Sequence, residues 1–353
     1  MSNYHKKKII ASVAPYLSTF RVYRLFQPFY SGLGQILMFH RVIPDSSKLR
    51  IHNHQSLEIS PTQLEETILY YKKKGYQFLS LDQFYDGIKN KTLNQKFVVL
   101  TFDDGYRDNY TIAYPILKKH SIPFTIYITT NFPDRKAILW WYILEDMIRD
   151  QTEVSFSWKG EKQNISLKTE QEKELGFDKI RNYINQNFDT DNYQDMLLAI
   201  LGDYQSDLYA YAHSHAMSWS EIQKINQDPL VTIGAHTVNH FPLKQMKDEE
   251  LIPEIMDSKT LLEKNIDQAV EHFAYPFGKA AEASYREFKA IKSLGFKTAT
   301  TTRMGNVFPG HSSYLECLPR ININRVSNTD VLQLQTSGML PFILHKGKKL
   351  VTH

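Results

Sequence analysis

The amino-acid sequence predicts an α/β protein built around a parallel barrel of the (β/α) type. Short apolar runs typical of strands alternate with helical patterns from Gly34 onward, and this alternation implies a parallel sheet with right-handed crossovers. These runs are mostly apolar, and a continuous apolar run is typical of a strand buried on both faces. About seven or eight such strands would suit a closed barrel. The alternation stops once, over residues 131–230, which indicates an insertion in one loop of the barrel.

The composition supports a folded domain and excludes several protein classes. Of the 353 residues, 42% are hydrophobic and 23% are charged, close to the averages for globular proteins, so wholesale disorder is excluded. The net charge of +4 is too small to argue for a nucleic-acid partner, and we expect none. The single cysteine, Cys317, cannot form an internal disulfide, which favours a reducing compartment. No run approaches the roughly 20 apolar residues that a membrane-spanning helix needs.

The first half of the barrel is predicted from four strands and two helices. The helix at 60–75 has a Ser60 cap, a proline in its first turn and Gly75 at its end. The apolar run KFVVLTF at 96–102 is typical of a fully buried strand. The other expected elements are strands at 35–42, 78–81 and 123–129 and a helix at 109–120.

After the insertion, the alternation of strand and helix patterns resumes. Strands are expected at 230–235, 272–275 and 296–301, with helices at 248–266 and 280–294. We therefore divide the chain into an N-terminal segment over 1–34 and a barrel over 35–345 that contains the insertion at 131–230.

The insertion is expected to be mostly helical, and it holds all four tryptophans of the chain. Loops at the carboxyl ends of barrel strands carry function, and tryptophan faces there can stack on sugar rings. We predict glycan contacts from Trp140 and Trp141, while Trp219 is expected in the insertion's own core. The alternative for Trp140 and Trp141 is that same core, although two adjacent helix positions cannot both face inward.

The N-terminal segment over 1–34 is basic and aromatic. The first acidic residue of the chain is Asp45, and Lys6, Lys7, Lys8, Arg21 and Arg24 precede it among many aromatic side chains. Such a segment suits the surface of an anionic membrane, and the alternative is a helix that covers one end of the domain. Pro15 and Arg21 interrupt the short apolar run, so no cleaved signal peptide is expected. We expect a cytoplasmic protein at the inner face of the membrane.

The strongest chemical motif is TFDDG at residues 101–105, at the end of an apolar strand. Two adjacent carboxylates at the carboxyl end of a barrel strand lie near the catalytic mouth. Because paired carboxylates repel each other, one arrangement is that Asp104 binds a cation and Asp103 acts as a base. The alternative is a strand-to-helix turn in which an aspartate caps the helix.

A second motif, HTVNH at 236–240, also follows a predicted strand. Histidines four residues apart lie on one side of a helical turn, an arrangement that can bring two imidazoles to one metal. Together with Asp104, His236 and His240 form a set of two imidazoles and one carboxylate, which suits a catalytic metal with an open position. A capping or surface role is the alternative for the two histidines.

A third motif, FAYPFG at 273–278, ends another predicted strand. An aromatic–proline–aromatic sequence makes a rigid wall beside a pocket, or only a turn. We predict substrate contacts from Tyr275, Pro276 and Phe277, and from Tyr106 through its backbone N–H, which could stabilise an oxyanion.

In this order, the three motifs resemble those of the polysaccharide deacetylases of the NodB-homology group, carbohydrate esterase family four. TFDDG is similar to the family's first motif, HTVNH fits its H-[S/T]-x-x-H motif, and FAYPFG is similar to a variant of its third, so that the resemblance covers roughly residues 35–340. It implies a distorted (β/α)7-type barrel and one divalent metal, usually zinc, bound by Asp104, His236 and His240. It also implies that Asp103 is the general base for hydrolysis of an N-acetyl group on an amino sugar.

The sequence departs from the family pattern at two places. The third motif usually carries an arginine that orients the base, but Ala274 stands there, and we predict that Arg320 compensates the charge of Asp103 instead. The family's last motif, which supplies the general acid, has no clear match. His40, at the end of the first predicted strand, is our candidate for the acid, with His311 and His345 as alternatives.

The predicted function is that of a metal-dependent hydrolase of non-peptide C–N bonds. The expected substrate is an N-acetylated glycan, either a surface polysaccharide, a lipopolysaccharide or a lipid-linked precursor, with Zn²⁺ as the expected metal. Two alternatives remain: an amidohydrolase that acts on a small amide, and a non-catalytic glycan-binding protein on a degenerate barrel. Two imidazoles and a carboxylate suit several divalent metals, so the residues alone do not choose zinc.

Overall fold

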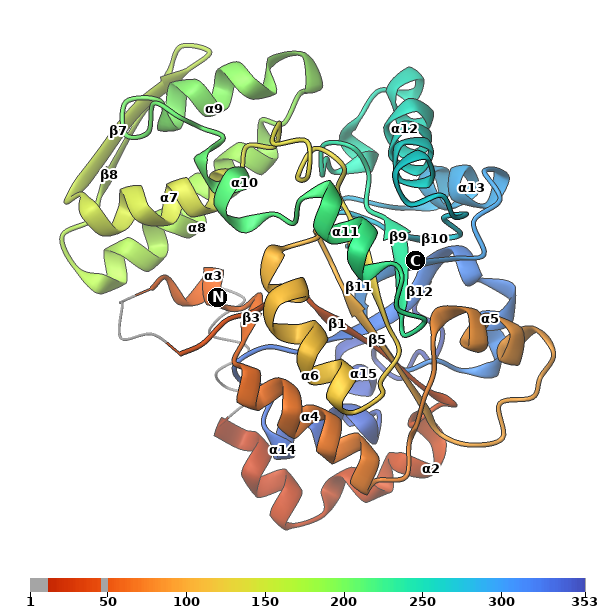
Figure 1. The fold of residues 1–353 in the computed structure, drawn as a ribbon. Coiled ribbons are helices and arrows are strands. Elements are labelled where there is room, and N and C mark those ends of the chain that lie inside the picture. The colour runs from red at the N-terminus through yellow and green to blue at the C-terminus, as the bar shows by residue number, and fades with distance from the viewer. Residues whose placement is uncertain (1–11, 46–49, 353) are drawn as a thin grey trace.

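A closed barrel of seven parallel strands forms the centre of the computed structural model, which describes residues 12–45 and 50–352 (Figure 1). Each barrel strand pairs with the next one along the chain, and the last, β12, pairs with the first, β1, to close the barrel. The predicted α/β barrel is therefore confirmed. The strands are β1 (Gly34–Phe39), β5 (Phe97–Phe102), β6 (Phe124–Ile128), β9 (Val231–Ala235), β10 (His272–Ala274), β11 (Thr298–Met304) and β12 (Leu318–Asn322).

Helices surround the barrel and bury its outer face. The apolar residues of these helices and of the strands form the largest hydrophobic cluster, which includes Phe102, Ile255 and Ile291. Helix α4 begins at the predicted Ser60 cap, which accepts a hydrogen bond from the Gln63 N–H. The helices are α4 (Pro61–Lys73), α5 (Leu81–Lys89), α6 (Tyr114–Lys119), α11 (Trp219–Ile225), α12 (Asp248–Ile266), α13 (Tyr285–Ser293), α14 (Thr329–Thr336) and α15 (Met339–Leu344).

Short elements modify the predicted pattern at several places. The expected helix at 109–120 starts as a π-helical turn, η2 (Asn109–Ala113), before Pro115 opens α6. The expected helix at 280–294 begins only at Tyr285. Further 3₁₀ turns join the larger elements, namely η4 (Leu243–Gln245), η5 (Pro309–Ser313) and η6 (Leu315–Cys317).

The expected strand at 35–42 is split, which corrects that prediction. The barrel strand β1 ends at Phe39, and β2 (Arg41–Val42) leaves the barrel to pair with β3 (Glu58–Ile59). The break puts His40 at the carboxyl end of β1. The strand expected at 78–81 is only β4 (Gln77–Phe78), which pairs with the start of β5, and α3 (His52–Gln55) lies between β2 and β3.

The insertion leaves the barrel after β6 and folds around its own core (Figure 1). It is mostly helical, as predicted, but it also contains an antiparallel hairpin that we did not predict. The sequence signal for that hairpin is the alternation of polar and apolar residues in EVSFSW, followed by Lys159 and Gly160, and the structure places both turn residues at positive φ. The elements are α7 (Trp140–Asp150), β7 (Glu153–Trp158), β8 (Glu161–Ser166), α8 (Glu170–Gln186), η3 (Thr190–Asn192), α9 (Tyr193–Leu201) and α10 (Ala210–His215).

The two ends of the described chain pack against each other. Residues 12–19 are helical and are followed by η1 (Val22–Leu25) and α2 (Gln27–Tyr30). Ala14 and Tyr23 bury against Leu334 and Leu340 of α14 and α15. The prediction for segment 1–34 also rests on Lys6, Lys7 and Lys8, which lie outside the described residues. Within the described ranges, no helix has the length and apolar character needed to cross a bilayer.

Candidate active site

Asp104, His236 and His240 converge at the carboxyl ends of β5 and β9. The Nε2 atom of His236 lies 3.3 Å from Asp104 Oδ1, and the Nε2 atom of His240 lies 3.2 Å from the same oxygen. One ligand atom from each of the three residues lies within 4.8 Å of the others. Asp104 Oδ1 is buried and has no hydrogen-bond partner in the described part of the chain. Two imidazole nitrogens and a carboxylate oxygen that converge in this way fit a divalent metal with an open coordination position.

The His236 ring is held in the orientation that a metal ligand needs. Its Nδ1 lies 2.7 Å from the backbone carbonyl oxygen of Ala274, and this carbonyl requires Nδ1 to carry the proton. The lone pair of Nε2 then points toward Asp104, as in histidine ligands whose other nitrogen donates to a carbonyl. Ala274 thus contributes through its backbone at the position where the family usually carries an arginine.

The loop 236–240 is not the helical turn that the sequence predicted, which is a correction. Thr237 and His240 have φ angles of 66° and 61°, and the loop is held by other contacts. The N–H of Asn239 donates to Glu254 on α12, at 2.6 Å, and the N–H of His240 donates to the Thr237 hydroxyl. The two imidazoles therefore face one point because of left-handed backbone turns, rather than because of helical spacing.

Left-handed backbone occurs in all three motifs. Asp104 has φ 77° and Phe277 has φ 58°, in addition to Thr237 and His240. Such conformations in residues other than glycine cost on the order of 1–3 kcal/mol each and cluster at functional sites. Gly105, at φ 84°, completes the turn after Asp104, and a Cβ there would lie 2.8 Å from Ile128 Cδ1. The folded structure thus holds these side chains in place at a cost in backbone strain.

Asp103 forms a buried bidentate pair with Arg320. The two guanidinium nitrogens lie 2.6 and 2.7 Å from the two carboxylate oxygens, and the Arg320 side chain is fully buried. Arg320 also donates to the Thr301 carbonyl and the Thr101 hydroxyl, so its position is set by three strands. Burial alone would raise the pKa of Asp103, but the charge and hydrogen bonds of Arg320 outweigh it and lower that pKa. Asp103 is therefore a carboxylate that can accept a proton.

His40 lies on the other side of Asp103. Its Nε2 is 3.9 Å from Asp103 Oδ2, its side chain is mostly buried, and its Nδ1 has no hydrogen-bond partner among the described residues. Burial lowers the pKa of His40, and the carboxylates of Asp104 and Asp103 oppose this effect. The two alternative histidines make contacts elsewhere: His311 Nδ1 accepts from the Phe308 N–H, and His345 Nε2 contacts the Met304 carbonyl. Of the three histidines, His40 is the one in contact with Asp103.

Aromatic rings line the site. The Phe277 ring centroid is 4.8 Å from that of His240, and the Trp141 centroid is 5.7 Å from it on another side. The Trp141 indole N–H donates to the Tyr106 hydroxyl at 3.2 Å. Both Phe277 and Trp141 are partly exposed, so they can meet a substrate.

Three predicted substrate contacts require correction at the level of the side chain. Trp140 is 3% exposed and belongs to the core of the insertion. Adjacent helix positions point in different directions, and the next residue, Trp141, faces the site instead. The Tyr275 side chain is fully buried, and its hydroxyl donates to the Glu316 carbonyl. Tyr106 is also buried, beneath Trp141, and Pro276 is buried beside Phe277. The prediction for Tyr106 concerned its backbone N–H and stays a prediction.

The sequence model of the polysaccharide deacetylase family matches residues 90–299, which is more than half of the chain and includes all three motifs. This chain belongs to the polysaccharide deacetylase family. It is 21% identical over 271 residues to YxkH of Bacillus subtilis (strain 168), which carries a polysaccharide deacetylase name, and the match covers 76% of this chain and 64% of YxkH. It is 36% identical over 86 residues to a poly-β-1,6-N-acetyl-D-glucosamine N-deacetylase of Staphylococcus aureus (strain N315), and the match covers 24% of this chain and 29% of that protein. The chain thus spans less than two thirds of the length of these relatives.

Solved structures with this fold confirm the architecture. The Streptococcus pyogenes deacetylase PplD aligns with a TM-score of 0.55 at 21% identity, covering 85% of this chain and 97% of PplD. IcaB from Ammonifex degensii aligns with a TM-score of 0.53 at 18% identity, covering 86% of this chain and 97% of IcaB. The chain therefore shares the barrel of these deacetylases.

Two residues beside this site, Arg41 and Tyr142, were not predicted from the sequence. Arg41 bonds to Asp108 at 2.7 Å and to the Tyr142 hydroxyl at 2.9 Å, and its guanidinium stacks over the Tyr106 ring. The signal was their position, because Arg41 directly follows His40 and Tyr142 directly follows Trp141. Their contacts, however, join segments 101 residues apart in sequence, which no local pattern shows.

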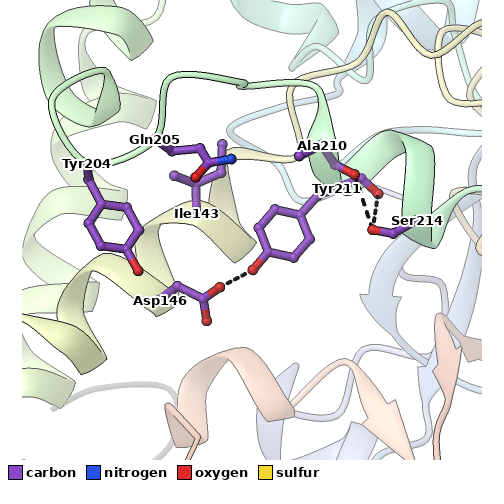
Figure 2. Close-up of a pocket in the computed structure, with 7 residues that line it drawn as sticks. All are labelled: Ile143, Asp146, Tyr204, Gln205, Ala210, Tyr211 and Ser214. Carbon is purple, nitrogen blue, oxygen red and sulfur yellow. Dashed lines mark hydrogen bonds between the residues drawn. The ribbon is translucent and has the colours of Figure 1, made fainter.

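A cavity of about 210 Å³ opens in the insertion beside α7 and α10 (Figure 2). Tyr204 and Tyr211 face it together with Asp146 and Gln205, and the Tyr211 hydroxyl donates to Asp146 (Figure 2). The Tyr211 ring lies 5.3 Å from that of Tyr142, and Tyr142 lies 6.3 Å from Trp141 at the site. The aromatic side chains of Trp141, Tyr142 and Tyr211 therefore form a row between the Asp104–His236–His240 cluster and this cavity.

Proposed function

We propose that this protein hydrolyses the N-acetyl group of an amino sugar within a glycan and releases acetate and a free amine, with one divalent metal as cofactor. The observation that carries this proposal is the pairing of Asp103 with Arg320 beside the Asp104–His236–His240 cluster. One carboxylate is positioned as a base, while the other faces two imidazole nitrogens. This division of roles suits metal-assisted hydrolysis of an amide, in which one group takes a proton from water and another holds the metal.

The residues of the chain supply the proton transfers. Asp103 would accept a proton from the attacking water while the oxygen of that water bonds to the acetyl carbon. The C–N bond then breaks, and the amine nitrogen takes up a proton from His40 in its imidazolium form, which the carboxylates of Asp104 and Asp103 favour and which returns to neutral imidazole. A divalent metal bound by Asp104, His236 and His240 would act as a Lewis acid that polarises the carbonyl and lowers the pKa of water. We propose Zn²⁺ as this metal.

A glycan substrate is favoured over a small amide by the surroundings of the site. Phe277 and Trp141 are partly exposed aromatic rings next to His240, and a separate cavity in the insertion is lined by Tyr204 and Tyr211. Exposed aromatic faces beside the site suit sugar rings, which stack on them. The relatives named poly-β-1,6-N-acetyl-D-glucosamine N-deacetylases support an N-acetylglucosamine polymer as the first substrate to test.

The test is acetate release from N-acetylglucosamine oligomers of β-1,4 and β-1,6 linkage, with metal content measured on protein purified without a metal-binding tag. We expect about one metal per chain and acetate release in the wild type. His240→Ala should lose both, whereas Asp103→Asn should keep the metal and lose activity by roughly 10²–10⁴-fold. Glu249→Gln, on the exposed side of α12, is the matched carboxylate control and should change neither.

Two results would contradict the proposal. If neither variant nor wild type binds metal after zinc is offered, the hydrolase assignment fails. If glycan binds without acetate release while metal is bound, the non-catalytic glycan-binding alternative becomes the better account.

A further inference from the structure

We propose that the two ends of the chain form one surface that binds an anionic lipid bilayer. This inference is independent of the proposed function. The docking surface consists of exposed apolar and aromatic side chains of residues 13–29 and 343–350, with basic side chains between them. Within this surface, the most exposed large side chains are Phe20 at 77%, Leu25 at 74%, Tyr16 at 68% and Phe29 at 63%.

The docking surface gathers most of the exposed large hydrophobic side chains in the described ranges. The surfaces of soluble proteins commonly expose single hydrophobic residues, but a contiguous group of them usually marks an interaction site. Besides the four above, the group includes Val13, Ile343, Leu344 and Leu350.

Packing joins the two segments into one surface. The Phe342 ring lies 5.0 Å from Phe26 and 4.7 Å from Tyr30, with Lys349 over the Tyr30 ring. Ser18 donates to Gln333 on α14 at 2.8 Å. Because these contacts hold both ends together, the exposed residues on each side of them can meet the same partner.

The charge of the docking surface complements anionic lipids. The sequence has no acidic residue before Asp45 and none after Asp330. Arg21, Arg24, Lys346, Lys348 and Lys349 are exposed on the described part of these ends. Cations that surround aromatic and aliphatic side chains are the combination that binds a bilayer surface, where the rings enter the interface and the cations meet headgroups.

A second copy of this chain fits the docking surface less well. A symmetric dimer would place the same basic, acid-free surfaces against each other. Like charges across an interface oppose association. A bilayer of opposite charge is therefore the partner that the structure favours.

The docking surface lies away from the active site. Ser31 and Gly32, which follow α2, accept hydrogen bonds from Lys96, directly before β5, so this end of the chain lies at the amino ends of β1 and β5. Asp104 and His236 lie at the carboxyl ends of β5 and β9. In Figure 1 the N-terminal helices are at the bottom, and the insertion is at the upper left. A docked molecule would keep its site open to a glycan.

The test is co-flotation of the full-length protein with vesicles of phosphatidylcholine alone and with one-third phosphatidylglycerol. One variant, Phe20→Ser with Leu25→Ser, removes apolar side chains, and a second, Arg24→Gln with Lys348→Gln, removes charges. The matched control is Tyr285→Ser with Lys289→Gln, which removes an exposed aromatic and a cation on α13. All substituted side chains are exposed, so each variant should fold.

We expect binding to the anionic vesicles that falls by roughly tenfold or more in both surface variants and stays unchanged in the control. Binding of the wild type to phosphatidylcholine alone should be much weaker. The proposal is overturned if both surface variants float as the wild type does, or if the lipid-free wild type is a dimer that these variants dissociate. Acetate release from short soluble oligomers should be the same in all variants, so a failure here is distinct from a failure of the proposed function.

Discussion

Asp103 and Asp104 are neighbours in sequence, but the structure gives them different partners. Asp103 faces the Arg320 guanidinium, while Asp104 faces His236 and His240. Burial would raise the pKa of Asp104, but the two histidines lower it well below its ordinary value. Both groups are therefore carboxylates. Asp103 is held by a cation, and Asp104 keeps an oxygen without a hydrogen-bond partner among the residues that the structure describes. The separation of their roles follows from these partners.

Removal of Arg320 should raise the pKa of Asp103. The carboxylate would then be buried without a cation, so the acid limb of the pH profile of kcat/KM should move to higher pH in Arg320→Ala. The free energy of unfolding should fall by about 3–5 kcal/mol at neutral pH, as it does when one partner of a buried ion pair is lost. In the wild type this stabilisation is present above the ordinary pKa of 3.8 and is lost as the pH falls below it. An acid limb at the same pH in Arg320→Ala and in the wild type would show that Arg320 does not tune the base.

The two adjacent tryptophans should respond differently to truncation. Trp140→Ala leaves a cavity in the core of the insertion and should lower the free energy of unfolding by about 3–5 kcal/mol. Trp141→Ala should instead raise KM for glycan oligomers, because its partly exposed ring lies 5.7 Å from that of His240. Denaturant unfolding and steady-state kinetics on both variants distinguish the two roles. Equal changes in KM would contradict the assignment of Trp141 alone to the substrate.

At the scale of elements, the insertion is attached to the barrel by a buried ion-pair cluster. Glu145 on α7 accepts hydrogen bonds from the Arg50 Nε and the Ile51 N–H, each at 2.7 Å, and contacts His54 at 2.5 Å. These three partners belong to the segment that connects β2 with β3. The cluster therefore fixes α7, and with it Trp141, relative to the end of β1.

This attachment should be sensitive to acid. Burial would raise the pKa of Glu145, but His54 and Arg50 lower it from 4.5 to about 2. A lowered pKa stabilises the fold above pH 4.5, and this contribution of about 3 kcal/mol is lost as the pH falls toward 2. Glu145→Gln should therefore be less stable than the wild type at pH 7, and the difference should shrink between pH 4.5 and 2.

Chemical denaturation of Glu145→Gln and of the wild type across that pH range measures this difference in the free energy of unfolding. Glu170→Gln removes an exposed partner of Arg149 and serves as the control, for which we expect little change. A stability difference for Glu145→Gln that stays constant from pH 7 to pH 2 would contradict the prediction.

At the scale of the whole molecule, the active site depends on barrel closure. The site collects side chains from β1, β5, β9 and β12 and from the insertion, and the pairing of β1 with β5 and β12 brings His40 beside Asp103. A metal held by Asp104, His236 and His240 would link β5 with β9, two strands that are separated by β6.

Metal binding should therefore stabilise the whole barrel. Zinc at a hundred times its dissociation constant is expected to add about 2.7 kcal/mol to the free energy of unfolding and to raise Tm by a few degrees. A chelator should reverse the shift. His240→Ala is expected to show no shift, and a Tm that rises equally in this variant would indicate that the metal binds elsewhere.

The sequence by itself determined the barrel, the convergence of Asp104 with His236 and His240, and the place of Asp103 beside them. Apolar strand runs are local patterns, and residues that follow parallel strands must meet at the same end of a barrel, so TFDDG and HTVNH could be brought together without a structure. Tertiary structure alone decided which side chain faces which neighbour. The sequence suggested Arg320 as the partner of Asp103, but only the structure shows their bidentate contact across 217 residues. Only the structure shows that Trp141 faces the site while Trp140 is buried. The left-handed turns at Thr237 and His240 replaced the expected helical turn. These outcomes depend on packing between distant segments, which supplies the energy to hold strained backbone and buried charge, and a local pattern does not encode it.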